Sequence, residues 1–214
     1  MVSEVEPLRH SGMIRQNEMV SIILGGSGGQ GVVSLGKLLA VAAMNEDLAV
    51  SCYPIYGAEM RGGYAFSTVI IAETEIPSPI VSRADAGVFL DSFAYDYLAP
   101  MVAEDGLLVV NSGLVKPKPE KTRRLFCLNV DRAAQELGDG RCANMVAAGF
   151  LAQLAWAGQP AVKPFPKLET LRKTLEVIFP DKPALVGLNR QALSAGYELK
   201  PEKDAGAGQN QQVR

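Results

Sequence analysis

The chain has 214 residues, of which 48% are hydrophobic, and this length suits one sizeable hydrophobic core but is too short for two full domains. Its 21 basic and 23 acidic residues give a net charge of −2, so the sequence carries no basic footprint for nucleic acid or an anionic membrane. No stretch reaches about 18 uninterrupted apolar residues, and the first residues are charged and polar where a signal peptide needs an apolar core. We therefore expect a soluble, cytoplasmic protein that binds neither nucleic acid nor a membrane.

A glycine-rich turn stands between a predicted strand and a predicted helix. The apolar run 19–24 is followed by Gly-Gly-Ser-Gly-Gly-Gln-Gly at 25–31 and by a helix-like stretch that reaches about Met44. This is the G-x-G-x-x-G pattern, whose exposed backbone N–H groups and helix dipole attract an anion without a basic side chain. The same glycines would also let the helix pack closely on the strand, and the sequence leaves both roles open. The candidate anion-binding residues are Gly26, Ser27, Gly28, Gly29, Gln30 and Gly31.

The rest of a dinucleotide-binding fingerprint is missing. An NAD site needs an acidic residue at the end of the second strand, about 20 residues further on, to bind the ribose. Glu46 and Asp47 fall in that window, but they precede the predicted strand Leu48–Tyr53 and are typical of a connecting loop. The sequence therefore favours a turn that tolerates phosphate over a complete NAD site.

A second glycine-rich segment, at 57–63, carries Arg61, Gly62 and Gly63 and leads into a predicted strand at 64–72. It follows the carboxyl end of the second strand, where open parallel sheets place their ligands. The guanidinium of Arg61 can hold a phosphate or a carboxylate with two parallel hydrogen bonds. A solvated arginine on a flexible turn is the equally weighted alternative.

The sequence does not favour a metal site or a histidine-based catalytic site. Cys52, Cys127 and Cys142 are far apart and form no C-x-x-C pattern, so this chain alone is not expected to bind an iron-sulfur cluster. Scattered thiols of this kind are most often small buried hydrophobic residues. His10, the only histidine, lies in a polar N-terminal segment.

Further strands are predicted in the middle of the chain. The proline-bearing stretch 76–79 suggests an edge hairpin, and the run 86–90 reads as a buried strand that ends at Asp91. Capping of the following helix is the favoured role of this carboxylate, ahead of a role in a ligand cleft. Two more apolar strands are predicted at 106–110 and 124–130, after which Asp131 starts a helix.

Helices dominate the last third of the sequence. The stretch 143–157 is nearly all small or apolar, which predicts a helix buried on most sides or pressed against a partner chain. Amphipathic helices follow at 168–179 and 184–195, the second of which is expected to stop at Gly196. We expect an N-terminal segment at 1–18, one α/β domain at 19–199 and a disordered tail at 200–214. The predicted fold is a single Rossmann-like domain with a mostly parallel sheet, helices on both faces and a C-terminal helical extension.

Together these motifs resemble the gamma subunit of the 2-oxoacid:ferredoxin oxidoreductases, the family of pyruvate, 2-oxoglutarate, branched-chain, indolepyruvate and phenylglyoxylate enzymes. The resemblance covers roughly Val20–Gly196. It rests on the glycine turn with its glutamine at 25–31 and on Tyr-Pro-Ile-Tyr-Gly-Ala-Glu-Met-Arg-Gly-Gly at 53–63. A weaker third signature consists of Asn144, Met145, Gly149, Asn189, Ala192 and Gly196.

The resemblance implies a subunit that is inactive alone, within a complex that oxidatively decarboxylates a 2-oxoacid to an acyl-CoA. Such a complex is expected to use thiamine diphosphate, magnesium, iron-sulfur clusters and coenzyme A, none of them held by this chain alone. The implied partners are alpha and beta catalytic subunits, a cluster-bearing delta subunit or its equivalent, and ferredoxin or another electron acceptor. The glycine turn and Arg61 would form an anion-binding rim at the CoA entrance or the subunit junction. A purely structural clamp subunit and a stand-alone dinucleotide-binding enzyme are the alternatives.

Overall fold

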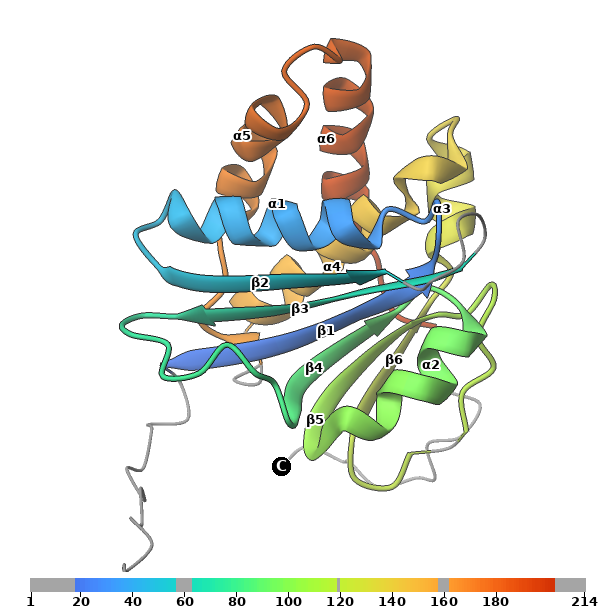
Figure 1. Cartoon of the computed structure of the whole chain (residues 1–214). Helices are drawn as coiled ribbons and strands as arrows, with labels where there is room; N and C mark the ends of the chain where they lie inside the picture. The colour runs from blue at the N-terminus through green and yellow to red at the C-terminus, as the bar shows by residue number, and fades with distance from the viewer. Residues whose placement is uncertain (1–17, 57–62, 119, 158–161, 203–214) are drawn as a thin grey trace, which may run out of the picture.

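The computed structural model describes residues 18–56, 63–118, 120–157 and 162–202. Its centre is a six-stranded sheet in the order β2-β3-β1-β4-β5-β6, with helices on both faces (Figure 1). The predicted α/β class and Rossmann-like architecture are therefore confirmed. The strands are β1 (Met19–Ser27), β2 (Ala49–Tyr56), β3 (Tyr64–Ala72), β4 (Ala84–Phe89), β5 (Val102–Asn111) and β6 (Arg124–Leu128).

The direction of one strand distinguishes this sheet from a simple parallel one. Strands β1, β4, β5 and β6 pair in parallel, whereas β3 lies antiparallel between β1 and β2. Because β3 is reversed, its first residue Tyr64 pairs with Ser27, the last residue of β1. Gly63, directly before β3, therefore lies at the edge of the sheet that carries the glycine turn.

The helices cover the two faces unequally. Helix α2 packs on one face, against β1 and β4, while α1 and α4 pack on the other, with α5 outside α1 and α6 outside α4 (Figure 1). Each face has its own hydrophobic core, because alternate strand residues point to opposite sides: Ile22 and Leu24 to one core, Ile23 to the other. The helices are α1 (Val32–Met44), α2 (Ser92–Leu98), α3 (Val130–Glu136), α4 (Ala143–Trp156), α5 (Leu168–Ile178) and α6 (Pro183–Glu198), with short 3-10 helices η1 (Ala99–Met101) and η2 (Gly140–Cys142).

Helix α4 is buried by the chain itself. It lies between the sheet, α1 and α6, and all but a few of its side chains are in the core. Of the two roles predicted for this apolar stretch, burial within the domain is therefore the one observed.

Two glycines set the close crossing of α4 and α6. A Cβ atom on Gly149 would lie 2.1 Å from the Leu193 carbonyl oxygen, and one on Gly196 would lie 1.9 Å from the Val146 carbonyl oxygen. The expected helix end at Gly196 is wrong, since α6 continues to Glu198. Here the glycine serves interhelical contact and not termination.

The strand predictions need two further corrections. No edge hairpin forms at 76–79: the segment between β3 and β4 has no strand, both neighbouring places beside β3 being filled by β1 and β2. Strand β2 continues past Tyr53 through Pro54 to Tyr56. Proline is tolerated there because β2 is an edge strand with β3 as its neighbour in the sheet.

Candidate functional site

The glycine turn lies at the carboxyl ends of the parallel strands, between β1 and α1. Gly25 and Gly26 belong to β1, so the turn itself spans residues 28–31. Gly29 and Gly31 have φ angles of 96° and 72°, which side chains of L-residues rarely permit. Gly31 occupies the N-cap position of α1 and leaves the helix start without a side-chain cap.

The turn is held mainly by its own hydrogen bonds. The Ser27 N–H donates to Gln30 Oε1 at 2.7 Å, and the Gln30 N–H donates to the Ser27 carbonyl at 3.1 Å. The Gly28 N–H donates to the Gly63 carbonyl at 2.7 Å. These three N–H groups are therefore occupied, and an anion would have to use the N–H groups nearer the start of α1.

The hydrogen bond between Gly28 and Gly63 joins the glycine turn to the last residue of the second glycine-rich segment. Arg61 and Gly62 lie outside the described residues. Their assignment to an anion-binding rim stays a prediction.

Ser27 and Gln30 tie the turn to the end of β4. The Gln30 side chain donates from Nε2 to the Leu90 carbonyl at 3.3 Å. The Ser27 hydroxyl donates to the Asp91 carboxylate, which also accepts from the Ala94 N–H at 2.8 Å and so caps α2. The favoured capping role of Asp91 is confirmed. The Ser27 hydroxyl is already engaged in a hydrogen bond to the capping carboxylate.

A second polar group extends the same edge toward β5 and α3. Asn111, buried at the end of β5, donates from Nδ2 to the Leu90 carbonyl at 3.1 Å and to Asp131 Oδ2 at 2.7 Å. Its Oδ1 accepts from the Gly113 N–H at 3.2 Å. The carboxylate of Asp131 is thereby held at a fixed place beside β4.

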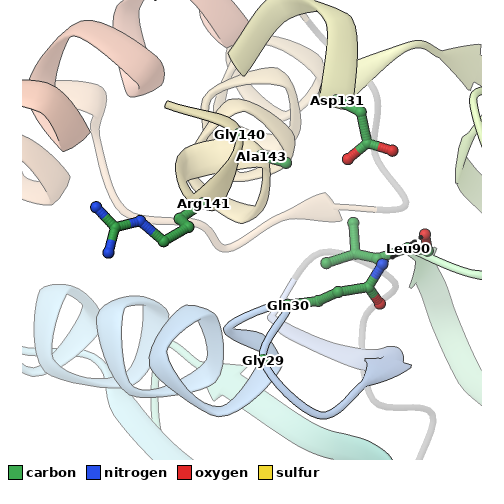
Figure 2. Close-up of a pocket in the computed structure, with 7 residues that line it drawn as sticks. All are labelled: Gly29, Gln30, Leu90, Asp131, Gly140, Arg141 and Ala143. Carbon is green, nitrogen blue, oxygen red and sulfur yellow. Dashed lines mark hydrogen bonds between the residues drawn. The ribbon is translucent and has the colours of Figure 1, made fainter. Parts of the chain in front are cut away.

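A small cleft of about 160 Å³ opens beside the glycine turn, between β1, β4, α3 and η2 (Figure 2). It lies at the point where the chain leaves β1 for one face of the sheet and β4 for the other, which is where open α/β sheets bind ligands. In Figure 2 the Gln30 side chain runs toward Leu90, while the Arg141 guanidinium points away from them at the opposite end of the cleft. The lining residues are Gly29, Gln30, Leu90, Asp131, Gly140, Arg141 and Ala143.

Arg141 is the basic residue at this cleft, and it is paired with Asp139. Its Nε donates to both carboxylate oxygens at 3.0 Å, and its backbone N–H donates to Asp139 Oδ1 at 2.9 Å. The hydrogen bonds from Arg141 lower the pKa of Asp139 to about 2. The Arg141 side chain remains 84% exposed, so it stays accessible to a ligand in spite of this pair.

Sequence reasoning did not identify Arg141 as a site residue, and it treated Asp131 only as a helix start. Neither belongs to a recognised motif. The position of Asp131 directly after a predicted strand could have marked it as a site residue. No sequence feature marks Arg141, because η2 reaches the cleft only through the packing of α3 and α4.

Packing accounts for several of the predicted anion-binding residues. A Cβ on Gly26 would lie 2.6 Å from Gln30 Oε1, and one on Gly31 would lie 2.4 Å from Asn144 Nδ2. The Asn144 amide, which belongs to the third sequence signature, donates to the Gly31 carbonyl at 2.9 Å. Around Gly29, by contrast, a Cβ would meet nothing within 4 Å, so this glycine faces open space.

The cysteines and acidic residues do not form a metal site in the part of the chain that the structure describes. Cys142 is buried, and burial raises the pKa of its thiol. Cys52 and Cys127 lie in β2 and β6 and are only half-buried, so of the three thiols Cys142 alone matches the predicted burial. Among these same residues, no helix is both long and apolar enough to cross a membrane.

Comparison with known proteins identifies the family. The model of the family described as pyruvate ferredoxin/flavodoxin oxidoreductase matches residues 21–199. The chain belongs to this family. The predicted resemblance is confirmed.

Two relatives of the family show different chain lengths. The ketoisovalerate oxidoreductase subunit VorA of Methanothermobacter thermautotrophicus is 31% identical over 87% of this chain, which spans only 38% of that relative. The pyruvate synthase subunit PorC of Thermotoga maritima is 29% identical over 81% of this chain and 90% of the relative. The same domain therefore occurs nearly alone and as little more than a third of a longer chain.

Solved structures show the same two chain lengths, a domain that is nearly the whole chain and a domain within a longer chain. The gamma subunit of a keto/oxoacid ferredoxin oxidoreductase from Geobacter sulfurreducens has a TM-score of 0.68 and 30% identity, over 84% of this chain and 96% of that one. A 2-oxoglutarate:ferredoxin oxidoreductase chain from Magnetococcus marinus has a TM-score of 0.73 at 21% identity, over 91% of this chain and 34% of its own length. The second likeness shows the shared fold.

Proposed function

We propose that this chain is the gamma subunit, or the corresponding domain, of a complex that oxidatively decarboxylates a 2-oxoacid to an acyl-CoA. Support comes from the family match over residues 21–199 and from the similarity to gamma subunits over nearly their whole length. Companion subunits would bind thiamine diphosphate and magnesium and would carry the iron-sulfur clusters that pass electrons to ferredoxin or another acceptor. The scattered cysteines of the present chain fit that division of labour.

The contribution of this chain is an anion-binding rim at the carboxyl edge of the sheet. The observation that supports this is the Gly28–Gly63 hydrogen bond, which holds Gly63, the last residue of the second glycine-rich segment, against the glycine turn beside the cleft of Arg141. The open Gly29, the start of α1 and the exposed guanidinium of Arg141 offer donors to a phosphate-bearing molecule such as coenzyme A. Arg61 belongs to the same proposed rim on the strength of its sequence position.

A stand-alone dinucleotide-binding enzyme has less support. Glu46, one of the two acidic residues in the expected window, accepts from the Lys167 N–H at 2.8 Å in a loop after α1. The clamp alternative rested on the apolar stretch 143–157, and α4 is buried by its own chain. Neither alternative has an observation in its favour.

The test is a reconstituted complex in which coenzyme A-dependent reduction of a dye is measured with a panel of 2-oxoacids. Arg61→Ala and Arg141→Ala each remove a charged donor, and one charge-assisted hydrogen bond of about 1.5 kcal/mol corresponds to roughly a tenfold change in affinity. We expect the apparent KM for coenzyme A to rise about tenfold in at least one variant while kcat changes less than about twofold.

Arg132→Ala is the matched control, because Arg132 is an exposed arginine of α3 that pairs with Glu136 at 3.0 Å outside the cleft. It should leave the KM unchanged. If both test variants assemble normally and keep the wild-type KM for coenzyme A, the rim does not bind this substrate. If no 2-oxoacid is oxidised by the assembled wild-type complex, the proposed activity itself is wrong.

A further inference from the structure

One face of the sheet is only partly covered by the chain's own helices. Among the described residues, α2 is the helix that packs on this face, and it lies over β1 and β4 and contacts the adjacent part of β3. The edge strand β2 lies beyond it (Figure 1). On this side of the sheet Tyr53 and Tyr64 are left exposed, while Phe66 is half-buried against the core under α2.

Aromatic side chains gather on this uncovered area. Tyr53 on β2 and Tyr97 on α2 are each 62% exposed, Phe93 is 54% exposed and Tyr64 is 42% exposed. Single exposed hydrophobic residues are common on protein surfaces, but a contiguous group of large aromatic residues is typical of an interaction site. We call this group the aromatic face and define it by the residues Tyr53, Ile55, Tyr64, Phe66, Phe93 and Tyr97.

The rings of the aromatic face contact one another between α2 and β3, and β2 continues the face beside β3. Ring centroids lie 6.0 Å apart for Phe93 and Tyr97, 5.2 Å for Tyr64 and Phe93, and 6.2 Å for Tyr64 and Phe66. Phe66 pairs in the sheet with Ile55, and Tyr53 points to the same side two residues before it. The patch is therefore continuous from α2 through β3 to the edge strand.

The size and chemistry of the patch suit the centre of a protein interface. None of its six side chains is charged, and a fully exposed aromatic side chain offers about 200 Å². Four rings at about half exposure leave on the order of 400 Å² in solvent, about half of one partner's share of a standard interface. If the partner surface carried unpaired charges, binding would remove those charges from water at a cost in free energy. The surface that best fits the aromatic face is therefore an apolar one.

The length of the long relatives indicates which molecule supplies that surface. This chain matches 38% of VorA and 34% of the Magnetococcus marinus chain, so in both proteins a larger remainder is joined covalently to the matching domain. In relatives such as PorC, the domain is nearly the whole chain, so within the proposed complex the equivalent of that remainder is a separate subunit.

We propose that the aromatic face docks an apolar surface of the companion catalytic subunit, the one equivalent to the remainder of the long relatives. The inference rests on the proposed function, since it presupposes the complex. Tyr64 directly follows Gly63, and the α2 cap at Asp91 accepts from Ser27. Docking here therefore places the companion beside the glycine turn and joins the interface to the candidate site.

The experiment compares assembly of the wild-type chain and a Phe93→Ser/Tyr97→Ser variant, each tagged and co-expressed with the companion subunits. Both side chains are exposed on α2, so the isolated variant should keep a melting temperature within about 3 °C of wild type. We expect the yield of co-purified companion, identified by mass spectrometry as the subunit equivalent to the remainder of VorA, to fall at least tenfold. A benzophenone amino acid in place of Phe93 should crosslink to that same subunit.

Met44→Ser/Val177→Ser is the matched control, because these exposed apolar residues on α1 and α5 lie on the opposite side of the sheet. It should co-purify with the companion at the wild-type yield. Wild-type yield from the Phe93→Ser/Tyr97→Ser variant would overturn the proposal, as would a wild-type dimer of this chain that the same variant makes monomeric. Loss of assembly in that variant with an unchanged KM for coenzyme A in the arginine variants would keep the docking face and reject the coenzyme A rim.

Discussion

At the scale of single residues, buried amide side chains fasten the candidate site to the core. Asn144 and Asn111 are almost fully buried, and each bonds a backbone carbonyl at the carboxyl edge of the sheet. Each of these carbonyls also accepts from a second donor, the Leu35 N–H for Gly31 and Gln30 Nε2 for Leu90, so each asparagine adds a further hydrogen bond from within the core. These residues therefore fix the glycine turn and the end of β4 without touching a ligand.

Asn144→Ala should lower the free energy of unfolding by about 1–3 kcal/mol, since it removes one of the two hydrogen bonds to the Gly31 carbonyl and leaves space beside a buried side chain, while the Leu35 N–H still donates to that carbonyl. Urea unfolding of the isolated chain measures this. Asn45→Ala is the control: Asn45 is exposed, and the buried Thr174 Oγ1 to which it donates at 3.1 Å keeps its own hydrogen bond to the Thr170 carbonyl, so the loss should cost less than about 1 kcal/mol. Equal costs for the two variants would show that burial of the Gly31 contact is unimportant.

The Asp139–Arg141 pair predicts a specific pH dependence. Because the pKa of Asp139 is lowered from 3.8 to about 2, its stabilising effect is present above pH 3.8 and is lost as the pH falls through about 2. The difference in melting temperature between wild type and Asp139→Ala should therefore shrink between these pH values. In a double-mutant comparison, the melting-temperature difference caused by Asp139→Ala should be smaller in the Arg141→Ala background, which lacks the side-chain donors. If the difference between wild type and Asp139→Ala did not change with pH, the proposed role of the pair would be refuted.

The sequence predicted this site only in part. The glycine turn and the Asp91 cap follow local rules of backbone conformation and helix capping, so they could be located from the residues alone. The cleft residues Asp131 and Arg141 meet the turn through tertiary packing from about a hundred positions further along the chain. No local pattern marks such a meeting.

At the scale of elements, α4 and α6 cross with their backbones in close approach at Gly149 and Gly196. Glycine at the crossing lets backbone touch backbone, and this explains the glycines of the third sequence signature. From the local sequence, Gly196 was predicted to end the helix. Its role in the contact with α4 becomes apparent only when the neighbouring helix is considered.

Gly196→Ala should destabilise the chain by roughly 2–4 kcal/mol, because the new methyl group would meet the Val146 carbonyl and force the helices apart. The unfolding midpoint in urea measures the loss. Gly187→Ala is a matched control in the same helix, where a Cβ meets nothing within 4 Å. It should instead stabilise by about 0.5–1 kcal/mol through better helix propensity, and a similar loss in both variants would contradict the crossing argument.

At the scale of the whole molecule, the type and rough position of most elements were predictable, but their order in the sheet was not. Alternating strands and helices imply a mostly parallel sheet. The insertion of reversed β3 between β1 and β2 depends on the pairing of distant strands. Because β1 and β2 pair with both edges of β3, the hairpin expected at 76–79 has no free strand edge of β3 to pair with.

Coverage of the sheet predicts how its strands resist opening. Strands β1 and β4 are central and have helices on both faces, whereas β2 is an edge strand beyond α2. In hydrogen exchange of the isolated chain, hydrogen-bonded amides of β1 and β4 should exchange at least about a hundredfold more slowly than those of β2. Equal protection in β2 would show that another segment covers that edge.

The burial of α4 within its own chain also bears on the kinetics of assembly. A domain that completes its core alone does not need to fold on its partner, so association is a collision of two preformed surfaces and its rate should scale with the concentration of each. The aromatic face carries no charge, and the chain as a whole carries −2, so little electrostatic steering is available from this side. Association should then proceed at about 10⁵–10⁶ M⁻¹s⁻¹ and change little with ionic strength, leaving the lifetime of the complex to be set by dissociation of the aromatic contacts.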